Sequence, residues 1–225
     1  MARASSPAYR RLAEDERRQL LIDATIAVLA EFGLSGTTVR KIATQAGVTP
    51  GLVTHYFSGK DALVSAAYRQ LAEKFHHDYV AAADAAGADP IERLKAFVGC
   101  AFQPETLDRN LLRVWTSFWT SALADSGAMP AQVHYETAQE SRRYLSSLLR
   151  EVFIAVGRRP SEKEIHELVI AVWSLVDGMW LTWGLDPKVF SPEGGRRIAF
   201  DVLAARLAIP QLASHASRHV SSEVG

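Results

Sequence analysis

The stretch from Thr38 to Lys60 constrains the fold of this chain more than any other, because helix starts and helix ends follow one another closely in it. Thr38 is an N-cap candidate, since its side-chain oxygen can accept a hydrogen bond from a free helix N–H. Gly47 can take the left-handed conformation that ends a helix. Thr49 can cap a second helix with Pro50 at its first position, where a missing N–H costs nothing. The spacing predicts two short helices joined by a tight turn.

The first of these helices has one apolar face, formed by Val39, Ile42, Ala43 and Ala46. With the apolar Val48 at the corner, the pattern is typical of a helix-turn-helix, whose second helix enters the major groove of DNA. An ordinary helical hairpin inside a bundle is the alternative interpretation. The short second helix, its aromatic end and the helix that starts directly after Lys60 favour DNA binding.

Residues spread over this segment together resemble the DNA-binding domain of the TetR family of transcriptional regulators. They are Thr37-Thr38-Val39, Ile42-Ala43, Ala46-Gly47-Val48, Gly51, His55-Tyr56-Phe57 and Lys60-Asp61-Ala62-Leu63. One departure is visible, because the family often has Leu-Tyr where this chain has Val53-Thr54. Thr54 replaces an aromatic residue that commonly touches DNA, so that contact is not carried over.

The resemblance continues downstream and covers about residues 12–207. Its motifs are Phe97-Val98-Gly99, Ser117-Phe118-Trp119, Ser141-Arg142-Arg143-Tyr144-Leu145 and Val176-Asp177-Gly178-Met179-Trp180-Leu181. They are similar to the BetI subgroup, repressors of the choline and betaine pathway. The resemblance implies an all-α, TetR-like fold, in which a three-helix DNA-binding domain is joined to a helical ligand-binding and dimerisation domain.

The candidate DNA contacts lie on the two short helices. Short side chains at the start and outer side of the second helix let its backbone approach base edges, and helix N-termini attract phosphate. Tyr56 and Lys60 match family positions that hold phosphates, although Tyr56 can instead be a core aromatic; Phe57 is assigned to the core. The expected DNA-binding residues are Thr38, Arg40, Thr49, Pro50, Gly51, Thr54, His55, Tyr56 and Lys60.

Charge is distributed unevenly along a chain of 225 residues with no net charge. Residues 1–60 hold 8 Lys or Arg and 5 Asp or Glu, and the remainder holds 17 and 20. The amino-terminal part is therefore the phosphate-facing candidate. Five arginines before the turn fit either a solvated arm or a phosphate or minor-groove role: Arg3, Arg10, Arg11, Arg17 and Arg18.

The single cysteine, Cys100, allows no disulfide within the chain and indicates a reducing compartment. No uninterrupted run of eighteen apolar residues and no signal-peptide h-region is visible, so no membrane partner is expected. These features predict a cytoplasmic protein.

Long apolar periodicities interrupted by Pro and Gly predict an all-α chain with helices at about 14–32, 38–46, 49–56, 61–85, 90–102, 105–125, 130–156, 161–185 and 191–207. The expected domains are a DNA-binding domain at 1–60, a ligand-binding and dimerisation domain at 61–210 and a frayed tail at 211–225. The eighth helix is apolar on nearly every side, which predicts burial against a second subunit. Gly178 and Gly184 would allow close helix approach. In the family, the last two long helices form the homodimer interface.

Catalysis finds little support in the sequence. His166-Glu167 begins a zinc-protease motif, but position 170 is Ile instead of the second His. His76 and His77 are adjacent and therefore poor co-ligands, and no Gly-x-Ser-x-Gly elbow is present. Neither an enzyme, a cofactor nor a metal site is expected.

Aromatic residues at helical spacing suggest a ligand site, although such stripes are often core or interface. The candidates are Trp115, Phe118, Trp119, Trp173, Asp177 and Trp180. A carboxylate in so apolar a helix needs a partner. That partner can be Arg113, Arg143 or a cationic ligand held by tryptophans. The BetI resemblance implies a choline-like quaternary ammonium, while the residues alone fit a polyamine equally well.

The sequence thus predicts a ligand-responsive repressor that binds a near-palindromic DNA operator as a homodimer. A constitutive DNA-binding regulator without effector, and a helical small-molecule-binding protein or enzyme, are the alternatives. The sequence does not select the operator, the target genes, the sign of regulation or the number of dimers on one operator.

Overall fold

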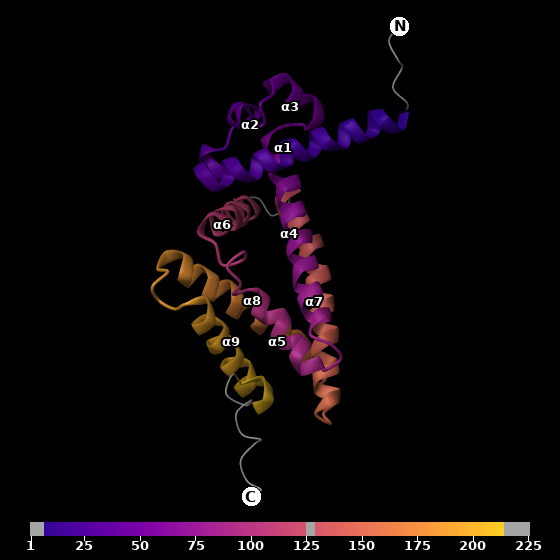
Figure 1. Ribbon diagram of the computed structural model, residues 1–225, viewed down its shortest axis with the longest axis vertical. Helices are drawn as coiled ribbons and strands as arrows, with labels where there is room; N and C mark the ends of the chain where they lie inside the picture. Colours follow the sequence, from indigo (N-terminus) through magenta and orange to yellow (C-terminus); the bar gives the residue numbers. More distant parts are fainter. Residues whose placement is uncertain (1–6, 125–128, 214–225) are drawn as a thin grey trace, which may run out of the picture. The chain divides into compact units, whose positions relative to one another are not determined.

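A computed structural model describes residues 7–124 and 129–213 of the chain, and within these ranges all regular structure is helical. The predicted all-α fold class is confirmed. The elements are α1 (Pro7–Gly36), α2 (Val39–Gln45), α3 (Pro50–Tyr56), α4 (Lys60–Ala85), α5 (Pro90–Cys100), α6 (Arg109–Ala124), α7 (Met129–Ala155), α8 (Glu162–Leu185), α9 (Pro192–Leu207) and the 3₁₀ helix η1 (Pro210–Leu212) (Figure 1).

The chain divides into two compact units. The first unit holds residues up to Ala72 together with Arg113–Thr137, and the second holds Glu73–Leu112 together with the residues from Ala138 onward. Helices α4, α6 and α7 each contribute residues to both units. The DNA-binding candidates all belong to the first unit.

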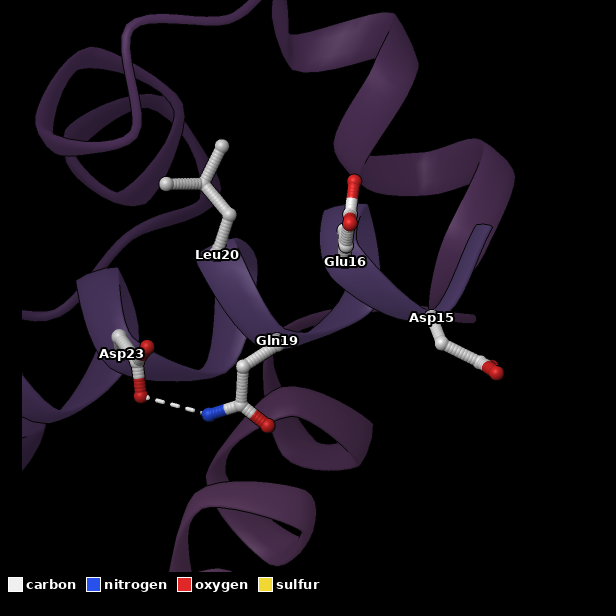
Figure 2. A pocket seen from close by; sticks show the side chains of 5 residues that line it. All are labelled: Asp15, Glu16, Gln19, Leu20 and Asp23. Carbon is white, nitrogen blue, oxygen red and sulfur yellow. Dashed lines mark hydrogen bonds between the residues drawn. The ribbon is translucent and has the colours of Figure 1, made fainter. Parts of the chain in front are cut away.

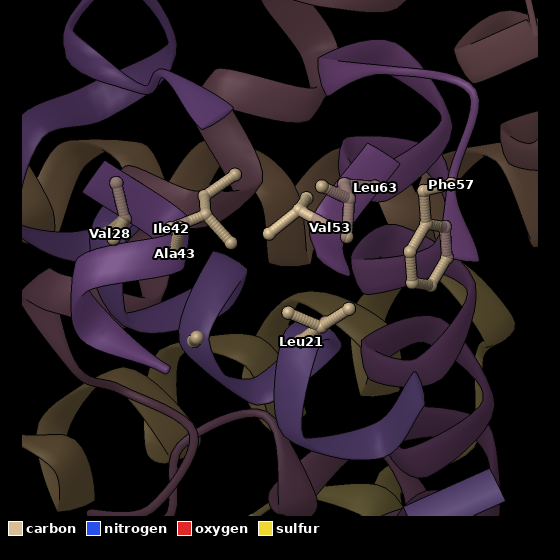
Figure 3. Close-up of a cluster of buried hydrophobic side chains, with 8 residues drawn as sticks. Leu21, Val28, Ile42, Ala43, Val53, Phe57 and Leu63 are labelled. Atoms are coloured by element: carbon tan, nitrogen blue, oxygen red, sulfur yellow. The ribbon is translucent and has the colours of Figure 1, made fainter. Parts of the chain in front are cut away.

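The first unit is built around a core shared by α1, α2, α3 and the start of α4. Figure 3 shows these side chains converging between the helices. Each of them is at most 6% exposed, which removes their apolar surface from water and fixes the short helices on α1. The members are Leu21, Ala24, Val28, Ile42, Ala43, Val53, Phe57 and Leu63.

The second unit buries one face of α8 and parts of α5, α7 and α9. Close packing of α9 depends on Gly195, because an added Cβ there would lie 2.7 Å from the Phe190 ring and 2.9 Å from the Phe102 ring. After α9, η1 buries Leu212. Of the expected tail, the residues from 214 onward lie outside the described part of the chain.

Two helix starts differ from expectation by more than one residue. The first helix begins at Pro7 instead of residue 14, with proline among its first residues, where its missing N–H is harmless. The sixth begins at Arg109 instead of residue 105. Asp108 caps it by accepting a hydrogen bond from Leu111 N at 2.8 Å, while the preceding turn buries Leu107.

In the part of the chain that the structure describes, two helices satisfy the length and apolarity of a membrane span, the Glu14–Gly36 part of α1 and the whole of α8. Each supplies fully buried side chains to its own unit, such as Leu21 from α1 and Leu168 from α8. Their apolar character is therefore used at least in part for internal packing.

The Gly195 contact gives a matched pair of glycine substitutions on the first turns of α9. Gly195→Ala should lower the free energy of unfolding by about 1–3 kcal/mol through overpacking against two rings. Gly194→Ala, whose Cβ would lie 3.4 Å from Ser191 Oγ, should be neutral or slightly stabilising. Thermal unfolding of both variants checks this, and equal melting temperatures would contradict the packing.

Candidate DNA interface and ligand-binding core

The turn between α2 and α3 is a complete Schellman motif. Gly47 has φ +66°, its N–H donates to Thr44 O at 3.1 Å, and Val48 N–H donates to Ala43 O at 2.9 Å. These two bonds satisfy carbonyls at the end of α2 that have no partner within the helix. Val48 then packs against the core of the first unit. The predicted role of Gly47 is confirmed.

Both short helices begin with the predicted threonine caps. Thr38 Oγ1 accepts a hydrogen bond from Lys41 N at 3.2 Å, and Thr49 Oγ1 accepts one from Leu52 N at 3.4 Å. Pro50 occupies the first turn of α3. Since each cap satisfies one helix N–H, the remaining amide groups at each N-terminus stay available to an anion such as a phosphate.

Helix α3 buries one side and leaves the other to solvent. Val53 is fully buried, whereas the opposite side carries only small or polar groups. The Thr54 hydroxyl donates back to Gly51 O at 3.1 Å, and a Cβ added to Gly51 would meet only Thr49 Oγ1 at 4.0 Å. The exposed candidates in this region are Thr38, Arg40, Thr49, Pro50, Gly51, Thr54 and His55, and Lys60 is half-buried.

Two arginines of α1 contact the end of α3. Arg18 Nη1 donates to the backbone oxygen of Tyr56 at 3.0 Å, and Arg17 Nη1 donates to its hydroxyl at 3.5 Å. The Tyr56 ring is half-buried against the core, which supports the core interpretation of this residue in part, while its phosphate contact stays a prediction. The hydrogen bond to Tyr56 raises the pKa of the Arg17 guanidinium. The solvated-arm alternative does not apply to these two arginines.

An acidic surface hollow lies along the same stretch of α1 but on another side of the helix, lined by Asp15, Glu16, Gln19, Leu20 and Asp23 (Figure 2). Gln19 Nε2 donates to Asp23 Oδ1 at 2.8 Å and to Gln70 Oε1 at the same distance. Its three carboxylates repel phosphate, so this hollow is no DNA contact.

The aromatic candidates on α6 pack in the first unit around Tyr68 of α4. The Tyr68 ring lies edge-on to Trp115 at 5.3 Å and to Phe118 at 4.6 Å between centroids. The Tyr68 hydroxyl also bonds His134 Nδ1 of α7. Trp119 is half-buried. Sequence reasoning missed Tyr68 and His134, which no motif marks.

The candidates on α8 pack in the second unit against Phe75, Tyr79 and Phe97. Trp173 contacts the Tyr79 ring at 5.8 Å, and Trp180 contacts the Phe75 ring at 5.5 Å. Trp180 Nε1 donates to Ala101 O at 2.8 Å, which makes this indole part of the buried framework. Among the described residues, the buried Trp173 Nε1 has no hydrogen-bond partner. The structure therefore divides the six predicted ligand contacts between the two units.

Asp177 lies on α8 beside these rings. Asp177 is exposed by the accessibility of the whole residue, although desolvation by the neighbouring groups raises the pKa of its carboxyl to about 6, and the positive charge of Arg142 opposes this shift. The cation that acts on Asp177 is Arg142, whereas Arg113 donates to Ala30 O, and among the described residues Arg143 forms no ion pair with Asp177. Within the described residues, Asp177 makes no salt bridge. Burial raises the pKa of Tyr79 well above its ordinary value, and Cys100 and Asp177 add to that rise.

From Ile170 onward, the exposed face of α8 carries large apolar side chains together with Ser174, Asp177 and Thr182. Ile170, Leu181 and Leu185 are 52%, 43% and 76% exposed, and Gly178 lies among them with open space around it. Gly184 behaves differently, because an added Cβ would lie 1.8 Å from Leu112 Cδ2 of the same chain. Helix α9, which packs on α8, exposes Ile198 and Val202.

No group of metal-binding side chains occurs in the part of the chain that the structure describes. His76 Nδ1 bonds Ser141 Oγ at 3.1 Å, whereas His77 and His166 are exposed. Burial raises the pKa of Cys100 to about 11, which leaves its thiol protonated and unreactive.

A capped seven-residue helix that follows a Schellman turn and exposes one side has the geometry of a helix-turn-helix. Residues 21–67 match the bacterial regulatory proteins of the tetR family, and residues 90–208 match the C-terminal domain of BetI-type transcriptional repressors. The HTH-type transcriptional regulator BetI of Stenotrophomonas maltophilia is 31% identical over 194 residues, which cover 86% of this chain and 94% of that relative.

Solved structures agree with this match. A transcriptional regulator from Pseudomonas aeruginosa superposes with a TM-score of 0.78 at 34% identity, over 88% of this chain and 93% of that chain. A regulator from Saccharomonospora viridis, solved in complex with choline, shares the fold with a TM-score of 0.72 at 18% identity, over 84% and 96% of the two chains.

The chain therefore belongs to the TetR family of transcriptional regulators, in its BetI-type group. Regulators of this family bind DNA operators and small-molecule effectors, and its members are not enzymes.

Proposed function

We propose that this protein is a cytoplasmic homodimer that represses transcription from a near-palindromic operator and is released from it by a small cationic amine. The exposed, capped α3 is the observation that carries the DNA-binding part. Its outward residues are short enough for the helix backbone to approach base edges closely. Thr49, Pro50, Gly51, Thr54 and His55 would then face the groove.

The phosphate contacts would come from both sides of α3. Thr38 and Arg40 lie at the start of α2, and Lys60 begins α4 directly after the recognition helix. Tyr56 presents its hydroxyl beside Arg17. Helix N-termini and basic side chains at these places would fix the register of α3 on the duplex without reading sequence themselves.

Lys60→Ala should weaken binding to every duplex and reduce the slope of log affinity against log salt by about 0.9, the value for one lost phosphate contact. Lys188→Ala, which removes an exposed lysine from the loop before α9, is the matched control and should leave the slope unchanged. Fluorescence anisotropy over a salt series measures both. A wild-type protein that selects no preferred duplex from random DNA would contradict the proposal.

Dimerisation is supported by the exposed apolar face of α8 and the adjoining residues of α9. Contiguous apolar surface of this kind is costly in water and typical of protein interfaces. Gly178→Phe introduces bulk where the protomer has open space, so the fold should survive while the two helices can no longer approach closely.

We expect Gly178→Phe to weaken the dimer at least tenfold, or about 1.4 kcal/mol. Ala85→Phe, at an exposed position at the end of α4, is the matched control. Sedimentation equilibrium measures the dissociation constants. A wild-type chain that stays monomeric at micromolar concentration would refute this interface.

The effector proposal rests on the α8 cluster of the second unit. Asp177 is a carboxylate without a salt bridge among the described residues, and Trp173 leaves a buried N–H without an acceptor. A quaternary ammonium satisfies the carboxylate electrostatically and gains about 0.5–2 kcal/mol from each cation–π contact. The choline bound by the Saccharomonospora viridis regulator makes choline the first compound to test. Trp115, Phe118 and Trp119 of α6 belong to the first unit and remain candidate ligand contacts there.

The pKa of Asp177 near 6 makes a pH dependence of ligand binding testable. Only the ionised carboxylate attracts a cation, so choline affinity should rise with pH and level off above 6. One pH unit below the pKa, binding should be about tenfold weaker. Isothermal titration calorimetry across this range, with polyamines as competing amines, checks the expectation.

Asp177→Asn should remove this pH dependence, and 3,3-dimethyl-1-butanol, the neutral carbon analogue of choline, should show none with the wild type. If no cationic amine binds at millimolar concentration, the proposal of a cationic effector is wrong. If Asp177→Asn unfolds the protein, Asp177 is structural and the aromatic rings are core.

A further inference from the structure

The position of α3 depends on contacts from outside the helix. Seven residues form a helix that is unstable by itself in water, because nucleation is costly and few hydrogen bonds follow. Thr49 holds its start through the cap, and Val53 anchors its middle in the core. Its end at Tyr56 has carbonyl groups with no partner inside the helix.

Arg18 of α1 binds this end at two points. Its Nη1 donates to Tyr56 O at 3.0 Å, and its guanidinium carbon lies 4.5 Å from the centroid of the Phe57 ring. A charged donor on the last carbonyl also complements the negative end of the helix dipole. Because Phe57 is itself buried, this one side chain connects α1 to both the helix end and the core.

The neighbouring Arg17 is placed differently. It is exposed, and its Nη1 reaches only the Tyr56 hydroxyl, at 3.5 Å. Two consecutive arginines therefore contact the same residue, one through its backbone and one through its side-chain tip. Arg18 is occupied by the protein, while the guanidinium of Arg17 stays open to a phosphate.

We propose that Arg18 is a positioning residue that fixes the recognition helix α3 on α1 and so determines how well the protein discriminates between DNA sequences. The inference rests on the proposed DNA-binding function. Base contacts carry sequence information and require an exact helix placement, whereas phosphate contacts tolerate small shifts. Loss of Arg18 should therefore reduce specific binding far more than non-specific binding.

The test compares Arg18→Met, Arg18→Lys and Arg17→Gln in the full chain. Hydrogen exchange of the free protein, resolved over residues 52–57, reports the order of α3 without any DNA. Arg18→Met should speed exchange there at least fivefold while Arg17→Gln leaves it unchanged. Arg18→Lys keeps a donor for Tyr56 O but lacks the planar group over Phe57, so it should restore protection in part.

The DNA measurement uses a duplex selected by the wild type and a scrambled duplex of equal length. Arg18→Met should lower the ratio of the two affinities about tenfold, the scale of one charge-assisted hydrogen bond, with an unchanged salt slope. Arg17→Gln should keep the ratio and lower the salt slope by about 0.9.

Three results would overturn the positioning role: unchanged exchange in Arg18→Met, faster exchange with an unchanged affinity ratio, or a salt slope lowered in Arg18→Met and fully restored in Arg18→Lys. The last result would make Arg18 a phosphate contact. A wild type without sequence preference would refute the proposed function, and the exchange data would still decide whether Arg18 holds α3.

Discussion

Burial of Val53 and Phe57 in the core of the first unit is the interaction on which the DNA-binding candidates depend. Helix α3 has too few residues to be stable alone, so its place is set by side chains on its inner face and at its end. With the anchoring confined to that side, the outer side can consist of threonine, glycine, proline and histidine. A larger outward side chain would add no stability and would keep the backbone away from a groove.

The turn at Gly47 also determines where α3 lies. Gly47 takes a conformation that most residues avoid, and the two hydrogen bonds of the Schellman motif end α2 within one residue. Thr49 then starts α3 almost immediately. Because the turn and caps leave little freedom, the angle between the two helices follows from local chemistry together with the buried Ile42 and Val53.

These local features explain how much the sequence predicts. Threonine caps, the left-handed glycine and the apolar faces act over a few residues, so they are readable from spacing alone, and the helix boundaries mostly follow. An aspartate such as Asp108 is also a local N-cap signal. The sequence prediction nevertheless started the sixth helix at residue 105, directly after Pro104, whereas the structure starts it after Asp108. The Arg18 contact joins residues 38 positions apart and leaves no local pattern.

The surroundings of the aromatic candidates could not be predicted from the sequence, because they depend on contacts between helices that are distant along the chain. Spacing on α6 and α8 indicated one face on each helix, but not that α4 supplies Tyr68, Phe75 and Tyr79 to the two clusters. The sequence also named Arg113 and Arg143 as possible partners of Asp177, whereas Arg142 is the arginine whose charge acts on its carboxylate. The expected apolar character of α8 is seen, with one face buried in the protomer and the other exposed.

We propose that a cationic amine and the operator each weaken the binding of the other, because they favour different states of one protein. The most direct test measures operator affinity with and without saturating choline, and choline affinity with and without saturating operator. Both affinities should fall by the same factor, in the range of about 5–150 that is typical of allosteric coupling. Operator affinity unchanged by a bound amine would contradict it.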